Sequence, residues 1–299
     1  GKENSYYQAE LEGILKEVLN RGQYILGEQV KLFEKNFANY CRTDYCVSTA
    51  SGTDALIIAL KALGCKENDK IVTVPNAGFY STAAILSIGG KPIYVDICEK
   101  TMAMSTASLE HTLNKTNDIK CVIATHLYGA MIDIDKIAGL AIEYNTLLLE
   151  DCSQAHGAEY MGSVAGTFGD AGTYSFYPTK NLGAIGDGGA IITGSKDIHD
   201  NALKLRQYGW GEKYKVALSG GQNSRLDELQ AAVLNFKLSK LNELNEARKL
   251  IVRRYASIPL KALKIFNISG SNFVAHMAIV RTRHRDKLRE FLLDNKIAC

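Results

Sequence analysis

Short β-branched runs alternate with helical patterns along the middle of the chain, and this alternation constrains the fold more than any other feature. The strand-like runs are residues 71–74, 92–95, 121–125, 146–149, 172–176 and 190–193, and helical patterns at 80–88 and 134–144 separate some of them. Such alternation is typical of a mostly parallel sheet with helices on both faces. The sequence therefore predicts an α/β fold around a mostly parallel central sheet.

Helical patterns also precede this region. Apolar residues recur at helical spacing from residue 11 to residue 40, and Gly22 and Gly27 divide them into two helices. A further helix is predicted at about residues 53–63, because Ser51 is a suitable N-cap residue and a glycine follows the last apolar position.

The C-terminal part predicts a second, smaller domain. Residues 224–257 lack Gly and Pro and read as one long helix or two in series, followed by a strand at 273–280 and a helix at 285–295. The sequence stops at Cys299 while this domain still looks incomplete, so we expect it to be truncated. The expected division is an N-terminal helical segment at 1–19, a large domain at 20–243 and the small domain at 244–299.

The charge and hydropathy patterns argue against two classes of partner. Lys and Arg total 35 against 32 Asp and Glu, the net charge is +3, and neither sign forms a block, so we expect no nucleic acid binding. The longest apolar stretches, such as residues 55–60 and 83–88, fall well below the roughly 20 residues that cross a bilayer. We therefore expect no membrane association.

The cysteines indicate a reducing compartment. Seven of them are scattered along the chain, and the first ten residues carry no secretory signal, so we expect a cytoplasmic protein. Cys41 and Cys46 are the closest pair, but four residues separate them and no His or Cys cluster lies nearby. We therefore expect no metal site.

Two ionisable residues follow predicted strands, and ligands of open α/β sheets bind beyond the carboxyl ends of the strands. Asp151 ends an apolar run, where a carboxylate needs a cationic partner or hydrogen-bond donors; the plain alternative is an aspartate that caps a turn. Lys180 leaves another strand in a glycine-rich loop that reaches Gly189. A loop lysine is ordinarily a solvated charge, but a lysine held in a pocket has a lowered pKa and acts as nucleophile and base.

A third element is a predicted phosphate site. The backbone amides of Gly52 and Thr53 open the capped helix and would face an anion, and the hydroxyl of Ser175 would add a donor. A lysine, an acid and a helix N-terminus together are what pyridoxal 5'-phosphate requires: a covalent anchor, a partner for the pyridine nitrogen and a phosphate cradle.

The sequence resembles the DegT/DnrJ/EryC1/StrS sugar aminotransferases in five motifs that follow one another in the family's order. The motifs are residues 27–30, 51–56, 150–157, 175–189 and 223–231. The resemblance implies the aspartate aminotransferase-like fold (PLP fold type I), with a central mixed sheet and a small C-terminal α/β domain. It also implies a homodimer whose active sites are shared between subunits.

Carried onto this sequence, the resemblance implies a role for eight residues. Lys180 binds the cofactor covalently, Asp151 contacts the pyridine nitrogen, and Gln154 contacts the ring hydroxyl. The other implied contacts are Gly52, Thr53 and Ser175 to the phosphate, Phe79 stacked on the ring, and Asn223 reaching the phosphate from the other subunit.

The implied reaction moves an amino group from an amino acid, L-glutamate by resemblance, to a nucleotide-linked keto-deoxysugar. Residues 74–78 and 176–183 look more like the branch that acts on 3-keto sugars than the branch that acts on 4-keto sugars, so amination at C3 is favoured and C4 is the alternative. A related sugar dehydratase would carry a histidine in place of Lys180. A non-catalytic regulatory relative is a further alternative, against which Lys180, Asp151 and Gln154 argue.

Two histidines lie close to these motifs. For His126 and His156 we favour packed or turn-forming roles over catalytic ones.

Overall fold

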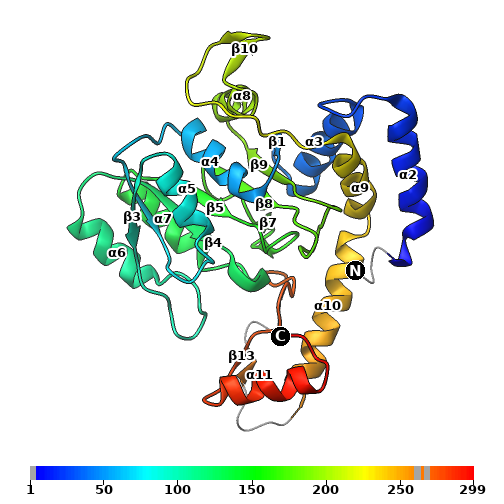
Figure 1. Ribbon diagram of the computed structural model, residues 1–299. Coiled ribbons are helices and arrows are strands. Elements are labelled where there is room, and N and C mark those ends of the chain that lie inside the picture. Colours follow the sequence, from blue (N-terminus) through cyan, green and yellow to red (C-terminus); the bar gives the residue numbers. More distant parts are fainter. Residues whose placement is uncertain (1–4, 259–263, 266–269) are drawn as a thin grey trace.

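The computed structural model describes residues 5–258, 264–265 and 270–299, and its centre is a seven-stranded sheet (Figure 1). The strand order is β1-β9-β8-β5-β4-β2-β3. The strands are β1 (Tyr45–Thr49), β2 (Lys70–Thr73), β3 (Lys91–Tyr94), β4 (Ile119–Thr125), β5 (Leu147–Asp151), β8 (Ala171–Ser175) and β9 (Gly189–Thr193). Neighbouring strands from β8 to β3 pair in parallel, whereas β9 is antiparallel to both β1 and β8. The prediction of a mixed, mostly parallel sheet is confirmed.

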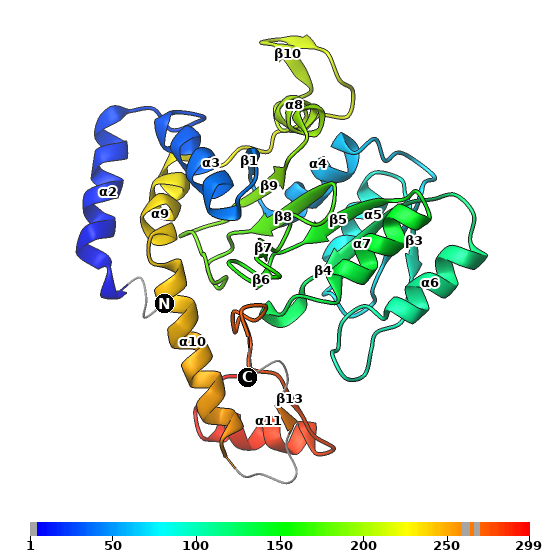
Figure 2. The same ribbon diagram turned by 180° about the vertical axis from the view of Figure 1, so that it is seen from behind.

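Helices cover both faces of this sheet. One face packs on α4 (Gly52–Ala62), α5 (Tyr80–Ser87) and α8 (Lys196–Leu205). The other packs on α3 (Glu28–Cys41), α6 (Thr106–Lys115), α7 (Ile134–Glu143) and α9 (Glu228–Leu238), as the two views in Figures 1 and 2 show. Successive side chains of a strand point to opposite faces, so Cys121 and Ile123 of β4 join the α4 side while Val122 and Ala124 join the other.

The remaining elements lie around this core. They are α2 (Gln8–Arg21), η1 (Leu127–Gly129), β6 (Glu159–Tyr160), β7 (Ser163–Val164), β10 (Trp210–Glu212), β11 (Lys215–Val216), α10 (Leu241–Ala256), β12 (Lys264–Ile265), β13 (Val280–Arg281) and α11 (Arg285–Asp294). In both views α2 lies beside α9, and α10 leads away from the sheet to α11. None of the helices in the described part of the chain has both the length and the apolar character needed to span a bilayer.

The predictions for the C-terminal half need correction at one helix boundary and at one strand. Of the two alternatives for residues 224–257, the structure has two helices in series, α9 and α10, but the first begins only at Glu228 and not at residue 224. Residue 224 lies in the preceding loop because the Ser224 hydroxyl donates to Asp54 (2.7 Å) and accepts from the Ala50 amide (3.0 Å). These two bonds hold Ser224 against the start of α4, and it does not join the helix that follows.

The strand predicted at residues 273–280 is wrong apart from its last residue. Phe273 forms only an isolated antiparallel bridge with Ala130, and Ala275 has a left-handed conformation (φ 52°) that interrupts a strand. The segment bonds to the turn after β4 instead. The Val274 amide donates to the Gly129 carbonyl (2.7 Å) and the Met277 amide to the Tyr128 carbonyl (3.2 Å). A C-terminal segment is thereby attached to the edge of the large sheet.

Candidate active site

The carboxyl ends of the parallel strands meet at one edge of the sheet, and α4 begins at the same edge. Asp151, the last residue of β5, is in register with Thr125 of β4 and Thr173 of β8. A Cβ atom built on Gly52 would lie 2.5 Å from the Cβ of Ser175, which ends β8. The start of α4 and the end of β8 are therefore in contact, and a glycine at position 52 permits the contact.

The two acids that end β5 have different surroundings. Asp151 is 4% exposed, and its Oδ1 accepts a hydrogen bond from the Ser153 amide (3.1 Å). Because alternate residues of a strand face opposite ways, Glu150 projects to the other side of the sheet. Asp151 is thus the acid that lies on the α4 side, where a ligand at the helix N-terminus would bind.

Lys180 lies close enough to Asp151 for their charges to interact. Burial lowers the pKa of the Lys180 amine below its usual value, and the Asp151 carboxylate opposes part of this shift. The Lys180 amide donates to the Tyr177 carbonyl (2.8 Å), so the backbone turns sharply as it leaves β8. The lysine and the aspartate, 29 positions apart in the sequence, are brought to one place.

Gln154 lies in the loop after Asp151, and its orientation is fixed. Its side-chain oxygen accepts a hydrogen bond from the Tyr128 amide (2.6 Å). The side-chain nitrogen therefore carries both of its hydrogens outward, and no acceptor for them exists among the described residues. A ligand oxygen is a suitable acceptor.

Phe79 and Asn223 lie at the surface. Phe79 is 63% exposed and precedes α5 in a left-handed conformation (φ 69°), without an aromatic neighbour in the described chain. Asn223 is exposed beside Ser224, whose hydroxyl binds Asp54 in the first turn of α4. The roles expected for these two residues stay predictions.

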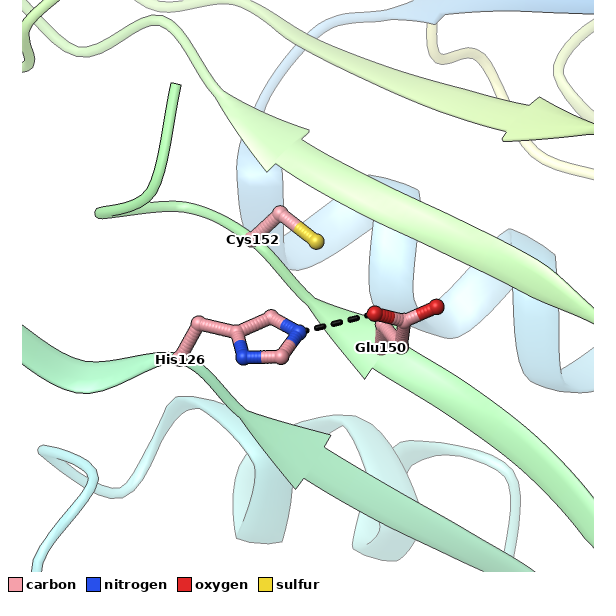
Figure 3. Close-up of side chains that lie close together, drawn as sticks. All are labelled: His126, Glu150 and Cys152. Carbon is pink, nitrogen blue, oxygen red and sulfur yellow. Dashed lines mark hydrogen bonds and ion pairs between the residues drawn. The ribbon is translucent and has the colours of Figure 1, made fainter. Parts of the chain in front are cut away.

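His126, Glu150 and Cys152 form a buried cluster on the opposite side of the sheet (Figure 3). His126 Nε2 donates to Glu150 (2.8 Å), and His126 Nδ1 accepts from the Ile132 amide (3.2 Å). Glu150 also accepts from three backbone amides, those of Gly166, Phe168 and Gly169. The imidazole nitrogens and the carboxylate oxygens are thus all engaged in hydrogen bonds, which agrees with the packed role favoured for His126.

The family model of the DegT/DnrJ/EryC1/StrS aminotransferase family matches residues 6–299. The chain belongs to this family. It is 36% identical over 293 residues to the dTDP-3-amino-3,4,6-trideoxy-alpha-D-glucose transaminase of Micromonospora megalomicea subsp. nigra, a match that covers 96% of this chain and 78% of that protein. It is also 36% identical over 294 residues to a Geobacillus stearothermophilus protein named pleiotropic regulatory protein, covering 97% of this chain and 78% of that one.

A solved structure extends the comparison to the fold. The crystal structure of S. venezuelae DesV in complex with a ketimine intermediate matches with a TM-score of 0.94 and 35% identity, covering 99% of this chain and 80% of that one. The aspartate aminotransferase-like fold predicted from the sequence is confirmed. Aminotransferases of the DegT/DnrJ/EryC1/StrS family depend on pyridoxal phosphate.

The residues at the sheet edge fit this cofactor. Within the described chain, the amides of Gly52 and Thr53 have no protein acceptor, because the hydroxyl and carbonyl of Ser51 bind the next two amides of α4. They are available to a phosphate at the helix N-terminus. The partly desolvated amine of Lys180 and the buried carboxylate of Asp151 are of the kinds that the other two positions require.

Sequence reasoning missed a set of polar residues next to Lys180 that are wholly or partly buried. Asn181 and Asn245 are 2% and 3% exposed and hydrogen-bond to each other, and His276 hydrogen-bonds to Asn181. The only signal in the sequence was a histidine within the apolar run 273–280, which looked like part of a strand. Nothing in its spacing linked it to residue 180, 96 positions earlier.

Proposed function

We propose that this chain is a pyridoxal-phosphate-dependent aminotransferase that moves the amino group of L-glutamate to C3 of a nucleotide-linked keto-deoxysugar. The observation that carries the proposal is the convergence of Lys180 and Asp151 at the carboxyl edge of the sheet, beside the free N-terminus of α4. The C3 position is supported by the relative named as a 3-amino-sugar transaminase.

Each side chain would have a defined task toward the cofactor. The amides of Gly52 and Thr53 and the hydroxyl of Ser175 would hold the phosphate, and Asp151 would keep a proton on the pyridine nitrogen. When bound, the cofactor supplies an electron sink for negative charge that develops on the α-carbon of the amino donor. The Gln154 amide, oriented by Tyr128, would donate to the ring hydroxyl.

Lys180 would move the proton. Its partial burial favours the neutral amine, the form that accepts a proton from the donor's α-carbon. The neutral form is therefore more populated at neutral pH than in a solvated lysine. The same amine returns the proton when the keto sugar takes the amino group, so the two substrates react in turn and ping-pong kinetics are expected.

The assembly and location of the protein belong to the same proposal. We propose a cytoplasmic homodimer, divided into the segments 1–19, 20–243 and 244–299, that binds neither nucleic acid nor membranes. The exposed position of Asn223 supports the dimer, because the side chain is accessible to a second subunit. Phe79 is likewise accessible for stacking on the cofactor.

Borohydride labelling tests the central assignment. The purified protein with added pyridoxal phosphate should be yellow, should bleach with borohydride, and should then carry the label on the peptide that contains Lys180. Lys180→Ala should abolish the label, whereas the control Lys115→Ala, at an exposed position on α6, should keep it. A colourless preparation, or a label on a different lysine, contradicts the assignment.

Product analysis tests the reaction. The enzyme is incubated with L-glutamate and a panel of dTDP- and UDP-linked 3-keto and 4-keto sugars, and the new amine is located by NMR. An amine at C3 is expected; an amine only at C4 selects the alternative branch. The relative named as a regulatory protein makes a non-catalytic role the second candidate, which absence of turnover with every sugar would favour.

A further inference from the structure

The buried Asn181 and Asn245 and the partly buried His276 form a hydrogen-bond network that adjoins Lys180. The Asn181 side-chain nitrogen donates to the Asn245 side-chain oxygen (2.8 Å) and to the Val274 carbonyl (2.8 Å). The Asn245 side-chain nitrogen donates to the His156 carbonyl (2.9 Å). Through these bonds α10 and the segment after residue 270 are joined to the loop that carries Lys180.

The network fixes the orientation of each amide. The His156 carbonyl only accepts, so the nitrogen of Asn245 must face it and the oxygen must face Asn181. The nitrogen of Asn181 must then face both Asn245 and the Val274 carbonyl, which leaves its oxygen facing His276. The orientation is set by backbone carbonyls at both ends.

The orientation of Asn181 determines the tautomer of His276. The contact joins His276 Nδ1 to the Asn181 oxygen (3.0 Å), and an amide oxygen cannot donate, so the hydrogen lies on Nδ1. His276 Nε2 then presents a lone pair. Among the described residues it has no hydrogen-bond donor.

His276 lies beside two of the predicted cofactor contacts, Lys180 and Gln154. A Cβ atom built on Gly129 would lie 2.6 Å from the His276 amide nitrogen, and the neighbouring Tyr128 amide binds Gln154. Burial first, and then the charges of Lys180 and Arg248, lower the pKa of His276 to about 3. The imidazole is therefore neutral at physiological pH.

We propose that His276 is a further active-site residue whose Nε2 accepts a hydrogen bond from a hydroxyl of the keto sugar, held in that tautomer by Asn181. This inference rests on the proposed function. A neutral lone pair suits a hydroxyl donor and offers nothing to the carboxylates of L-glutamate, which are acceptors. The only N–H donor of L-glutamate is its amino group, which is the group that is transferred, so the proposed contact belongs to the half-reaction with the sugar.

Two substitutions separate this role from a structural one. His276→Asn keeps a side-chain N–H for Asn181 but removes the acceptor at the Nε2 position, whereas His276→Gln places an amide oxygen near that position. The matched control is His284→Gln, an exposed histidine at the start of α11.

The half-reactions are measured separately through the absorbance of the bound cofactor. The first follows addition of L-glutamate, and the second follows addition of a dTDP-linked 3-keto-6-deoxyhexose. In His276→Asn we expect the KM for the sugar to rise by about tenfold, the loss of one hydrogen bond, with the glutamate half-reaction within about twofold. His276→Gln should recover most of the loss. Equal effects on both half-reactions, or none on the sugar, overturn the proposal.

A second readout does not depend on the loaded enzyme. In the apoprotein labelled with ¹⁵N-histidine, long-range ¹H–¹⁵N spectra at pH 7 report which ring nitrogen of His276 is protonated, and the His276→Asn spectrum identifies its signals. A protonated Nδ1 and a bare Nε2 are expected, and a proton on Nε2 overturns the proposal. If the unaltered enzyme fails to react with glutamate at all, it is the proposed function that fails.

Discussion

Replacing Gly52 with Ala is the most direct test of the phosphate cradle. The new Cβ would lie 2.5 Å from the Cβ and 3.0 Å from the Cα of Ser175. Carbon atoms pack at about 3.5–4.0 Å, so α4 and β8 must separate by roughly 1 Å. Because the Cα of Ser175 belongs to the backbone, a change of rotamer cannot relieve the contact. Overpacking of this kind costs about 1–3 kcal/mol of folding free energy.

The displacement should weaken cofactor binding as well as folding. The amides of Gly52 and Thr53 and the Ser175 hydroxyl would no longer converge on one phosphate. One or two charge-assisted hydrogen bonds would be lost, each worth about 1.5–3 kcal/mol. The Kd for pyridoxal phosphate should therefore rise by at least about tenfold. The assay is a titration of apoprotein followed by absorbance, with urea unfolding in parallel. The control is Gly139→Ala in α7, where an added Cβ meets nothing within 4 Å. An unchanged Kd in the Gly52→Ala variant would falsify the cradle.

Three further changes have defined outcomes. Asp151→Asn should lower kcat by about two orders of magnitude or more while the KM values change little, because a fixed charge opposite the cofactor nitrogen is lost; steady-state kinetics within a few-fold of the parent would contradict its role. Burial holds the pKa of His156 and of His276 at about 3 in the folded state, whereas the same side chains protonate near pH 6.5 in the unfolded chain. The apoprotein should therefore lose stability as the pH falls from 6.5 toward 3, by about 1.4 kcal/mol per pH unit for each of these two histidines. Urea unfolding at several pH values measures this slope, which His276→Asn should reduce and His284→Gln should not. Glu150→Gln should destabilise the apoprotein by roughly 2–4 kcal/mol, because one acceptor for buried amides becomes a donor, and an unchanged unfolding midpoint would count against that account of the cluster.

The sheet was predictable from the sequence because its signals are local. Each run of β-branched residues carries its own strand preference, and the rule that ligands bind at the carboxyl ends of parallel strands directed attention to Asp151 and Lys180. In the structure, the charge of Asp151 acts on the partly buried amine of Lys180, so the two residues lie near each other. Strand β1 escaped prediction because its five residues include two polar ones that the fold buries completely, Ser48 and Thr49.

The polar network beside Lys180 was beyond such reasoning because no member carries a local signal. Asn181 is oriented by the backbone carbonyl of Val274, which lies 93 positions away in the sequence, so its role cannot be predicted from its neighbours in the chain. Likewise, the run 273–280 has the apolar character of a strand, yet its backbone donors find carbonyls in the loop 128–129. Long-range packing decides both cases.

Tyr128 shows how these distant parts act as one unit. It holds a left-handed conformation (φ 65°), which costs a residue with a side chain about 1–2 kcal/mol. Its amide orients Gln154, and its carbonyl accepts from the Met277 amide, so the strained residue is fixed from both sides. Straightening Tyr128 would break the bond that orients Gln154 and the bond that anchors the segment carrying His276. The predicted cofactor contact at position 154 and the proposed sugar contact at position 276 therefore depend on the same turn of the backbone.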